Sequence, residues 1–237
     1  MHTDEHLLEI LRKYDGWMKE GLIPYAGRIL PVPEAFPSPD WVLPTQQAVE
    51  ILRTAGTLAV GDCVCRSHYG RCDHPLRTCL MMNDVAQAFI QAGGAMRIQL
   101  EQAEQILRIA NLRGLVHQAV YRPKDDIWVV CSCCPCCCYG LQMLKQFGRE
   151  DLLVRSDFIA HTDAARCTDC AVCVARCVFQ ARQTVAGKVL FASERCYGCG
   201  LCVTTCPEEA VTLDLRGDRD TWPTTGRAAS TMRPGES

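Results

Sequence analysis

The sequence has no long hydrophobic run, no excess of charge of either sign and few aromatic residues. Its 25 basic and 27 acidic side chains give a formal net charge of −2, and no basic stripe points to a nucleic-acid partner. No apolar stretch is long enough to cross a bilayer, so no membrane insertion is expected. The charged N-terminus lacks the apolar segment of a secretory signal, and no twin-arginine signal is present, which favours a cytoplasmic location.

Common nucleotide-binding and catalytic motifs are also missing. No GxGxxG follows an expected strand, no P-loop is present and no nucleophile elbow occurs. The sequence therefore offers no dinucleotide site, no phosphate-binding loop and no hydrolase nucleophile.

What the sequence has in abundance is cysteine, with 18 residues in two dense groups. Ten lie between Cys63 and Cys138 and eight lie between Cys167 and Cys206, whereas both ends of the chain have none. A disulfide scaffold is one explanation, but disulfide-rich chains are usually short and secreted. Because nothing in the sequence resembles an export signal, thiols that bind metal in a reducing cytoplasm are the better interpretation.

Composition and periodicity divide the chain into three parts. Residues 1–155 are expected to form a mostly helical α+β domain with cysteine-rich loops that bind metal. Residues 156–215 are expected to form a second, smaller domain. Residues 216–237 are polar, contain Gly and Pro, and are expected to be a disordered tail.

Hydrophobic spacing predicts the elements of the first part. Helices are expected over 4–20, 46–55, 80–92, 100–112 and 139–148. Strands are expected over 57–60, 115–121 and 126–130. Five prolines predict an extended surface segment over 31–44. A helix followed by a hairpin is also typical of a winged-helix DNA-binding module, but no basic recognition helix stands out.

The eight C-terminal cysteines form two copies of one motif. The run Cys167-x2-Cys170-x2-Cys173-x3-Cys177 recurs 29 residues later as Cys196-x2-Cys199-x2-Cys202-x3-Cys206-Pro207. This spacing resembles that of the bacterial 2[4Fe-4S] ferredoxins, in which the fourth cysteine of each run binds the other cluster. The motif is highly specific and leaves little room for the alternative that these thiols bind zinc.

The resemblance implies a ferredoxin-like (bacterial dicluster) fold over 156–215 and two cross-ligated [4Fe-4S] clusters. Cluster I would be bound by Cys167, Cys170, Cys173 and Cys206. Cluster II would be bound by Cys196, Cys199, Cys202 and Cys177. Two hairpin ladders are expected, one pairing 158–161 with 211–213 and the other pairing 184–186 with 189–191 around Gly187-Lys188. The family usually has Pro after the fourth cysteine, but Val178 follows Cys177, so the surroundings of cluster II are expected to differ.

The ten N-terminal cysteines also form two groups along the chain. The first group is Cys63, Cys65, Cys72 and Cys79. The second group is Cys131, Cys133, Cys134, Cys136, Cys137 and Cys138. Thiols this dense are not ordinary packing residues, because without a metal they would be redox liabilities. If the two loops converge, they could hold one or two additional Fe-S clusters. A four-thiolate [4Fe-4S] site is the plainest version, and the subset of ligands stays open.

The same region resembles the N-terminal part of uncharacterised 4Fe-4S binding proteins of anaerobes, in which CxCR and a CxCCxCCC run flank a helical segment. That resemblance implies metal binding but no activity. The CCG-type domain of heterodisulfide reductases is a looser comparison, because its CC pairs lie far apart along the chain and here they are crowded.

Five basic side chains surround the first cysteine group: Arg66, His68, Arg71, His74 and Arg77. They could offset cluster charge, bind an anion or couple protons to electrons, or they could form an ordinary solvated loop. His117 is interpreted as a structural residue. Asp62 and Asp73 have no evident partner.

A ferredoxin module passes one electron per cluster, and its fusion to a further metal site predicts an electron-transfer protein of anaerobic metabolism. Its partner would be a redox protein or the other subunits of an oxidoreductase, and whether the chain is itself an enzyme stays open. One alternative is a self-contained reductase whose N-terminal cluster or thiols act on a small disulfide, a sulfur species or a corrinoid. Another is a zinc- or redox-sensing protein.

Cross-ligation makes the effect of a single substitution specific. Cys206→Ser is expected to damage cluster I rather than cluster II, although Cys206 lies in the second cysteine run. EPR spectra of the reduced variant, resolved cluster by cluster, check this. Loss of cluster II with cluster I intact would overturn the cross-ligated assignment.

Overall fold

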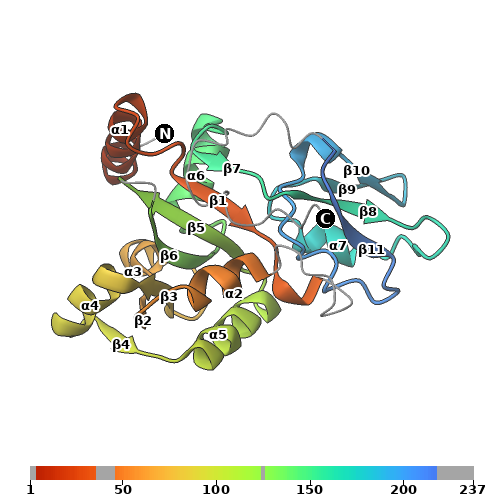
Figure 1. The fold of residues 1–237 in the computed structure, drawn as a ribbon. Coiled ribbons are helices and arrows are strands. Elements are labelled where there is room, and N and C mark those ends of the chain that lie inside the picture. Colours follow the sequence, from red (N-terminus) through yellow and green to blue (C-terminus); the bar gives the residue numbers. More distant parts are fainter. Residues whose placement is uncertain (1–3, 36–45, 124–125, 218–237) are drawn as a thin grey trace, which may run out of the picture.

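The computed structural model describes residues 4–35, 46–123 and 126–217 (Figure 1). Most of the proline-rich segment, the residues 124–125 of the expected hairpin turn, and nearly all of the expected tail lie outside these ranges. Within them, no helix combines the length and the apolar character needed to span a membrane.

The N-terminal part is built on a seven-stranded mixed sheet with the order β4-β2-β3-β6-β5-β1-β7. Its strands are β1 (Gly27–Leu30), β2 (Leu58–Asp62), β3 (Arg77–Met82), β4 (Ala95–Arg97), β5 (Val116–Arg122), β6 (Asp126–Cys133) and β7 (Leu153–Val154). The pair β1–β7 is parallel and the other neighbouring pairs are antiparallel.

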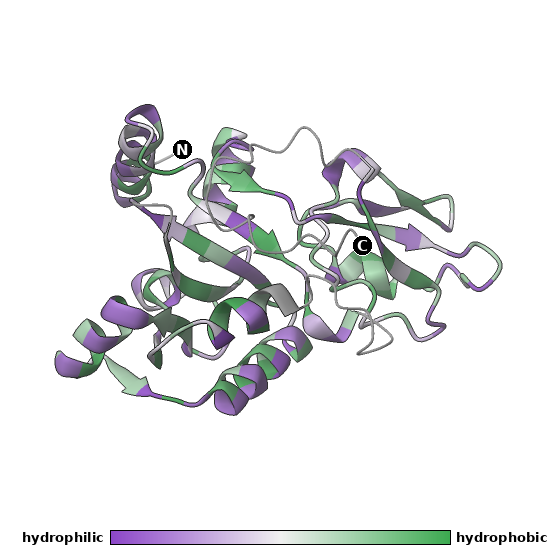
Figure 2. Ribbon diagram, in the orientation of Figure 1, coloured by the Kyte–Doolittle hydropathy of each residue, from purple (hydrophilic) through white to green (hydrophobic). Residues whose placement is uncertain are grey.

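Helices cover both faces of this sheet. They are α1 (Glu5–Lys19), α2 (Gln46–Arg53), α3 (Val64–Tyr69), α4 (Asn83–Gln91), α5 (Leu100–Leu112) and α6 (Tyr139–Phe147), with a 3₁₀ turn η1 (Pro33–Ala35). Successive side chains of a strand point to opposite faces, so Leu80 of β3 packs with α2 and α5 while Met81 packs with α4. Hydrophobic and hydrophilic residues alternate along α5, as expected of a helix with one buried side (Figure 2).

The sequence predicted a mostly helical first part, and the seven-stranded sheet corrects that prediction. The helices expected over 4–20, 46–55, 100–112 and 139–148 are confirmed as α1, α2, α5 and α6. The helix expected over 80–92 is wrong in its first residues, because β3 continues to Met82. Five consecutive residues of β3 are buried, and a strand buried on both faces lacks the polar alternation that identifies strands in a sequence. The short elements β1, β4 and α3 were not expected.

The C-terminal part contains β8 (Phe158–Thr162), α7 (Val172–Arg176), β9 (Arg182–Val185), β10 (Lys188–Phe191), η2 (Ser193–Arg195) and β11 (Val211–Leu215). The two expected ladders are present as β8–β11 and β9–β10, the second of which turns at Ala186-Gly187, one residue earlier than predicted. The internal repeat extends to the backbone, since Ala192 N donates to Ala181 O and Asp163 N donates to Ala210 O, both at 2.8 Å.

The two parts share one hydrophobic core. Ile29 and Leu141 of the first part and Phe158 and Leu201 of the second belong to the same buried cluster. Val32 N also donates to Cys199 O at 2.9 Å. In Figure 1 the C-terminal part, cyan to blue, lies beside the edge of the sheet that carries β1 and β7. The cysteine loops of the second repeat therefore pack directly on the first part.

Candidate metal centres

Two small cavities of the C-terminal part are each lined by four cysteines. One, of about 20 Å³, is lined by Cys177, Cys196, Cys199 and Cys202 among others. The other, also of about 20 Å³, is lined by Cys167, Cys170, Cys173 and Cys206 among others. These sets take three thiols from one repeat and the fourth from the other, as in the cross-ligated arrangement that the resemblance to bacterial 2[4Fe-4S] ferredoxins implies.

Backbone groups around the two cavities suit negatively charged clusters. Ala181 N donates to Cys177 Sγ at 3.2 Å, and at the equivalent place Ala210 N donates to Cys206 Sγ at 3.3 Å. Such bonds stabilise negative charge on the sulfurs. The residues present therefore fit two [4Fe-4S] clusters.

The loops keep one backbone shape even where the sequence does not favour it. Gly198 and Gly200 have φ angles of 67° and 78°, and a Cβ at Gly198 would lie 2.1 Å from Phe158 O. The equivalent residues of the first repeat are Asp169 and Ala171, with φ angles of 55° and 62°. Positive φ is unfavourable for residues with a Cβ, so the first loop is held in this shape by its surroundings.

A buried arginine lies between these two cavities. Arg182 lines both of them and is 2% exposed. Its Nη1 donates to Thr162 Oγ1 at 2.9 Å, but its Nε and Nη2 have no hydrogen-bond partner among the described residues. Burial alone would lower the pKa of Arg182, but nearby Cys202 and Cys173 raise it overall. The equivalent residue of the second repeat is Val211, so the repeated cysteine motif did not predict a buried arginine at this position.

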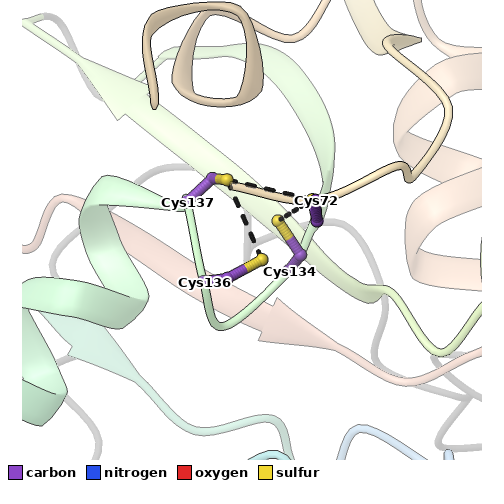
Figure 3. Close-up of side chains that lie close together, drawn as sticks. All are labelled: Cys72, Cys134, Cys136 and Cys137. Atoms are coloured by element: carbon purple, nitrogen blue, oxygen red, sulfur yellow. Dashed lines mark hydrogen bonds between the residues drawn. The ribbon is translucent and has the colours of Figure 1, made fainter. Parts of the chain in front are cut away.

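Four N-terminal cysteines form a compact group: Cys72, Cys134, Cys136 and Cys137 (Figure 3). Their sulfurs all lie within 4.8 Å of one another. Cys72 comes from the loop after α3, and the other three come from the turn between β6 and α6. The group therefore joins the two cysteine-rich segments, which is the convergence that the sequence left open.

The sulfur spacing of this group suits one tetrahedral ion. The Cys72–Cys134, Cys72–Cys137 and Cys136–Cys137 pairs each have a sulfur separation of 3.8 Å. Thiolates bound to a tetrahedral Zn²⁺ at about 2.3 Å lie about 3.8 Å apart. A [4Fe-4S] cubane spreads its four thiolates more widely, because four irons lie between them. Within the described ranges, no other group of potential ligands is gathered as tightly around one point.

The other six N-terminal cysteines form a closed ring. In order around it they are Cys63, Cys65, Cys138, Cys133, Cys131 and Cys79, and each thiol interacts with the thiol on either side. The Cys79 and Cys131 sulfurs are 4.0 Å apart. We call this set the six-thiol ring. Both sequence groups contribute to it, and its separation from the four-cysteine group was not visible in the sequence.

The sheet explains how the ring forms. Cys131 and Cys133 are two residues apart on β6, so their side chains lie on the same face, next to Cys79 of the neighbouring strand β3. Ser132 between them points to the other face and lies 3.2 Å from Nδ1 of the buried His117. Burial lowers the pKa of His117 to about 4, in keeping with a structural role.

The acidity of the ring thiols alternates. The pKa is lowered at three positions, where the sulfur accepts hydrogen bonds from both neighbours: Cys63, Cys131 and Cys138. It is raised at the three positions between them, where interactions with both neighbouring thiols and burial favour the protonated form: Cys65, Cys79 and Cys133.

One arginine lies between the ring and the four-cysteine group. Arg66 is 2% exposed, its Nη1 donates to Ser132 O at 2.8 Å, and the same nitrogen lies 4.0 Å from Cys134 Sγ. Burial opposes its charge, but Cys63 and Cys134 raise its pKa overall. Arg66 therefore offsets negative charge at both places.

The other basic residues that the sequence singled out lie farther from the sulfurs. Arg71 donates to Gln142 Oε1 at 2.8 Å and to Cys136 O at 3.3 Å. The ring of His68 lies 4.2 Å from that of His6. Arg77 is exposed.

The remaining candidates from the sequence are the basic residues Arg77 and His74 and two aspartates, Asp62 and Asp73. Arg77 pairs with Asp62 at 3.2 Å, which supplies the partner that the sequence did not reveal for this carboxylate. His74 is the exception among the outer basic residues, because its backbone N–H helps to lower the pKa of Cys72. Asp73 is exposed.

A cavity of about 250 Å³ lies beside the six-thiol ring and is lined by all six of its cysteines. The rest of its wall is mainly apolar and includes Tyr14 of α1, Met81 of β3 and Trp128 of β6. Arg66, Lys13 and Gln118 supply its polar groups. Sequence reasoning missed this cavity, because it is closed by α1, a helix far from any cysteine in the chain.

Residues 160–207 match a family model described as a 4Fe-4S dicluster domain. No curated protein matches the chain. The C-terminal part is therefore a ferredoxin-type iron–sulfur module, which implies electron transfer. The match does not reach the N-terminal cysteines.

The buried charge of Arg182 is expected to raise the reduction potential of the neighbouring clusters, because it favours the more negative reduced state. Arg182→Val should therefore shift at least one ferredoxin cluster to a lower potential, whereas Arg182→Lys should shift it less. The exposed Arg195→Val serves as the control. Redox titration followed by EPR checks this, and unchanged potentials in a fully loaded Arg182→Val protein would refute it.

Proposed function

We propose that this chain is an iron–sulfur electron-transfer protein that connects a redox partner, through its ferredoxin module, to a second metal centre in the thiol-rich first part. The observation that carries the proposal is the shared core. Cys133 and Cys138 of the six-thiol ring belong to the same buried cluster as Cys196, with Leu141 and Leu153 packed among them.

When bound, each [4Fe-4S] cluster accepts and releases one electron. The chain contributes the thiols that hold the clusters, the amides of Ala181 and Ala210 that donate to two of those sulfurs, and the guanidinium of Arg182. Val32 N fixes the loop that carries Cys199 against the first part. All four cysteines assigned to cluster II thus belong to or pack against the core that also contains Cys133 and Cys138.

The four-cysteine group has the features of a structural centre in this scheme. Its sulfurs have the spacing of a single tetrahedral ion, and it ties the loop of Cys72 to the turn after β6. We assign it a stabilising role, with zinc as the ion that fits four thiolates at this spacing. The six-thiol ring is then the part of the N-terminal region that is free for redox chemistry.

A second candidate function is favoured by the cavity beside the ring. A protein that only relays electrons needs no ligand cavity, whereas a reductase needs room for its substrate next to the sulfurs. The cavity, at about 250 Å³, would admit a small disulfide or sulfur species but is too small to enclose a corrinoid. Two electrons from the module and two protons would convert a disulfide into two thiols.

The number of electrons that the protein takes up tests the electron-transfer proposal. Because the module accounts for about two electrons, one per cluster, coulometric titration of the fully loaded protein should find more than two. The Arg66→Ala/Cys131→Ser double variant, whose N-terminal centre is damaged, serves as the comparison. It should take up only about two electrons. Uptake of about two electrons by the wild type would contradict the proposal.

The reductase candidate has a separate measurement. The chemically reduced protein is mixed anaerobically with a small organic disulfide, and the thiols released are counted. Two thiols per disulfide, with reoxidation of the ferredoxin clusters, would support a reductase. Clusters that stay reduced would leave electron transfer to a protein partner as the function.

A further inference from the structure

We propose that the six-thiol ring binds a single polynuclear metal–sulfur cluster with more than four thiolate ligands, and that one side of this cluster faces the apolar cavity. This inference deepens the proposed function, on which it rests for the cluster's role as electron acceptor. The binding of the cluster itself can be tested independently.

The number and arrangement of the sulfurs carry the proposal. A tetrahedral ion and a [4Fe-4S] cubane each use four thiolates. The ring has six, all six line one cavity, and the Cys79 and Cys131 sulfurs lie 4.0 Å apart within it. Among the described residues, no part of the ring is gathered around a single point as the four-cysteine group is. A cluster that engages all six thiols accounts for this arrangement.

The ring is built on a rigid scaffold. Cys79 and Cys131 lie on adjacent strands inside the sheet, and Cys138 is the N-cap of α6. Cys138 thus lies at the positive end of that helix, where a thiolate is favoured. Sulfurs fixed in this way are positioned before any metal arrives, as ligands of a preformed site are.

Buried charge also points to bound metal. Cys133 is 5% exposed and Cys138 is 6% exposed, and among the cavity-lining side chains only Arg66 and Lys13 carry positive charge. The buried Nε of Arg66 has no hydrogen-bond partner among the described residues. Six thiolates bound to metal would far exceed these two cations, and burying unpaired charge is costly. The metal ions of a cluster inside the ring would supply the positive charge that this chain does not.

Disulfide formation does not explain the ring. Sulfurs in a disulfide are about 2.05 Å apart, whereas those of Cys79 and Cys131 are 4.0 Å apart. All six ring cysteines are unpaired in the structure.

The cavity gives the cluster an accessible side. It has about 250 Å³ of space beside the sulfurs, and Tyr14, Trp128 and Met143 form apolar wall opposite them. A ligand that reaches the cluster would therefore be small and largely apolar. Lys13 of α1 offers one positive charge to a ligand that carries an anionic group.

Metal and sulfide analysis of anaerobically reconstituted protein tests the proposal. The ferredoxin module accounts for about eight iron and eight sulfide per chain. We expect the wild type to exceed both numbers. The ring double variant Cys79→Ser/Cys131→Ser should fall to about eight of each and keep both ferredoxin EPR signals, which shows that it is folded. The matched control Cys72→Ser/Cys136→Ser should lose a single metal ion and no sulfide.

Alkylation provides a second readout that does not depend on a variant. Ring cysteines of the loaded wild type should resist iodoacetamide and become reactive after the metal is chelated, as mass spectrometry of peptides would show. A wild type with about eight iron and eight sulfide, or with ring thiols that react freely, would overturn the proposal. Extra iron and sulfide in a protein that takes up about two electrons would instead leave the cluster in place and remove its role as electron acceptor.

Discussion

The pairing of β6 with β3 is the constraint on which the thiol-rich centre depends. This pairing places Leu80 opposite Val130, so that Cys79 and Cys131 follow on the same side of the sheet. Two-residue periodicity then brings Cys133 to the same face. The chain beyond β6 turns at once into α6, which returns Cys138 to the ring and leaves three cysteines in the turn for the four-cysteine group. One dense run of cysteines is thus divided between two centres.

A second constraint joins this centre to the ferredoxin module. The edge strand β7 leads directly into the module, and Phe158, which follows β7 closely in the chain, is fully buried in the common core. A bulky residue buried at such a junction resists separation of the two parts, because exposing it would cost about 1.5–3 kcal/mol. The loop of Cys199 and the ring are consequently held in a fixed relation, which would serve the proposed electron transfer between them.

The sequence predicted the module far better than it predicted the N-terminal centre. The cysteine spacing, through the resemblance to bacterial 2[4Fe-4S] ferredoxins that it carries, led to the two ladders and to the two sets of four cysteines that line the cavities. The N-terminal thiols obey no local rule. Cys72 belongs to a different group from Cys65 and Cys79 because of strand pairing. That pairing depends on residues far apart in the chain. Likewise, Arg182 is an unremarkable residue of β9 in the sequence, and its burial between the cysteine cavities follows from the packing of both repeats.

The central claim is that the first part holds two kinds of metal centre, one in the four-cysteine group and a larger one in the six-thiol ring. Anomalous X-ray diffraction from crystals of the anaerobically purified protein, recorded on both sides of the iron and zinc absorption edges, tests it most directly. We expect iron inside the six-thiol ring as well as in the two ferredoxin cavities. Among Cys72, Cys134, Cys136 and Cys137 we expect a single metal ion and no cubane. A cubane in the four-cysteine group together with a ring that contains no metal would contradict it.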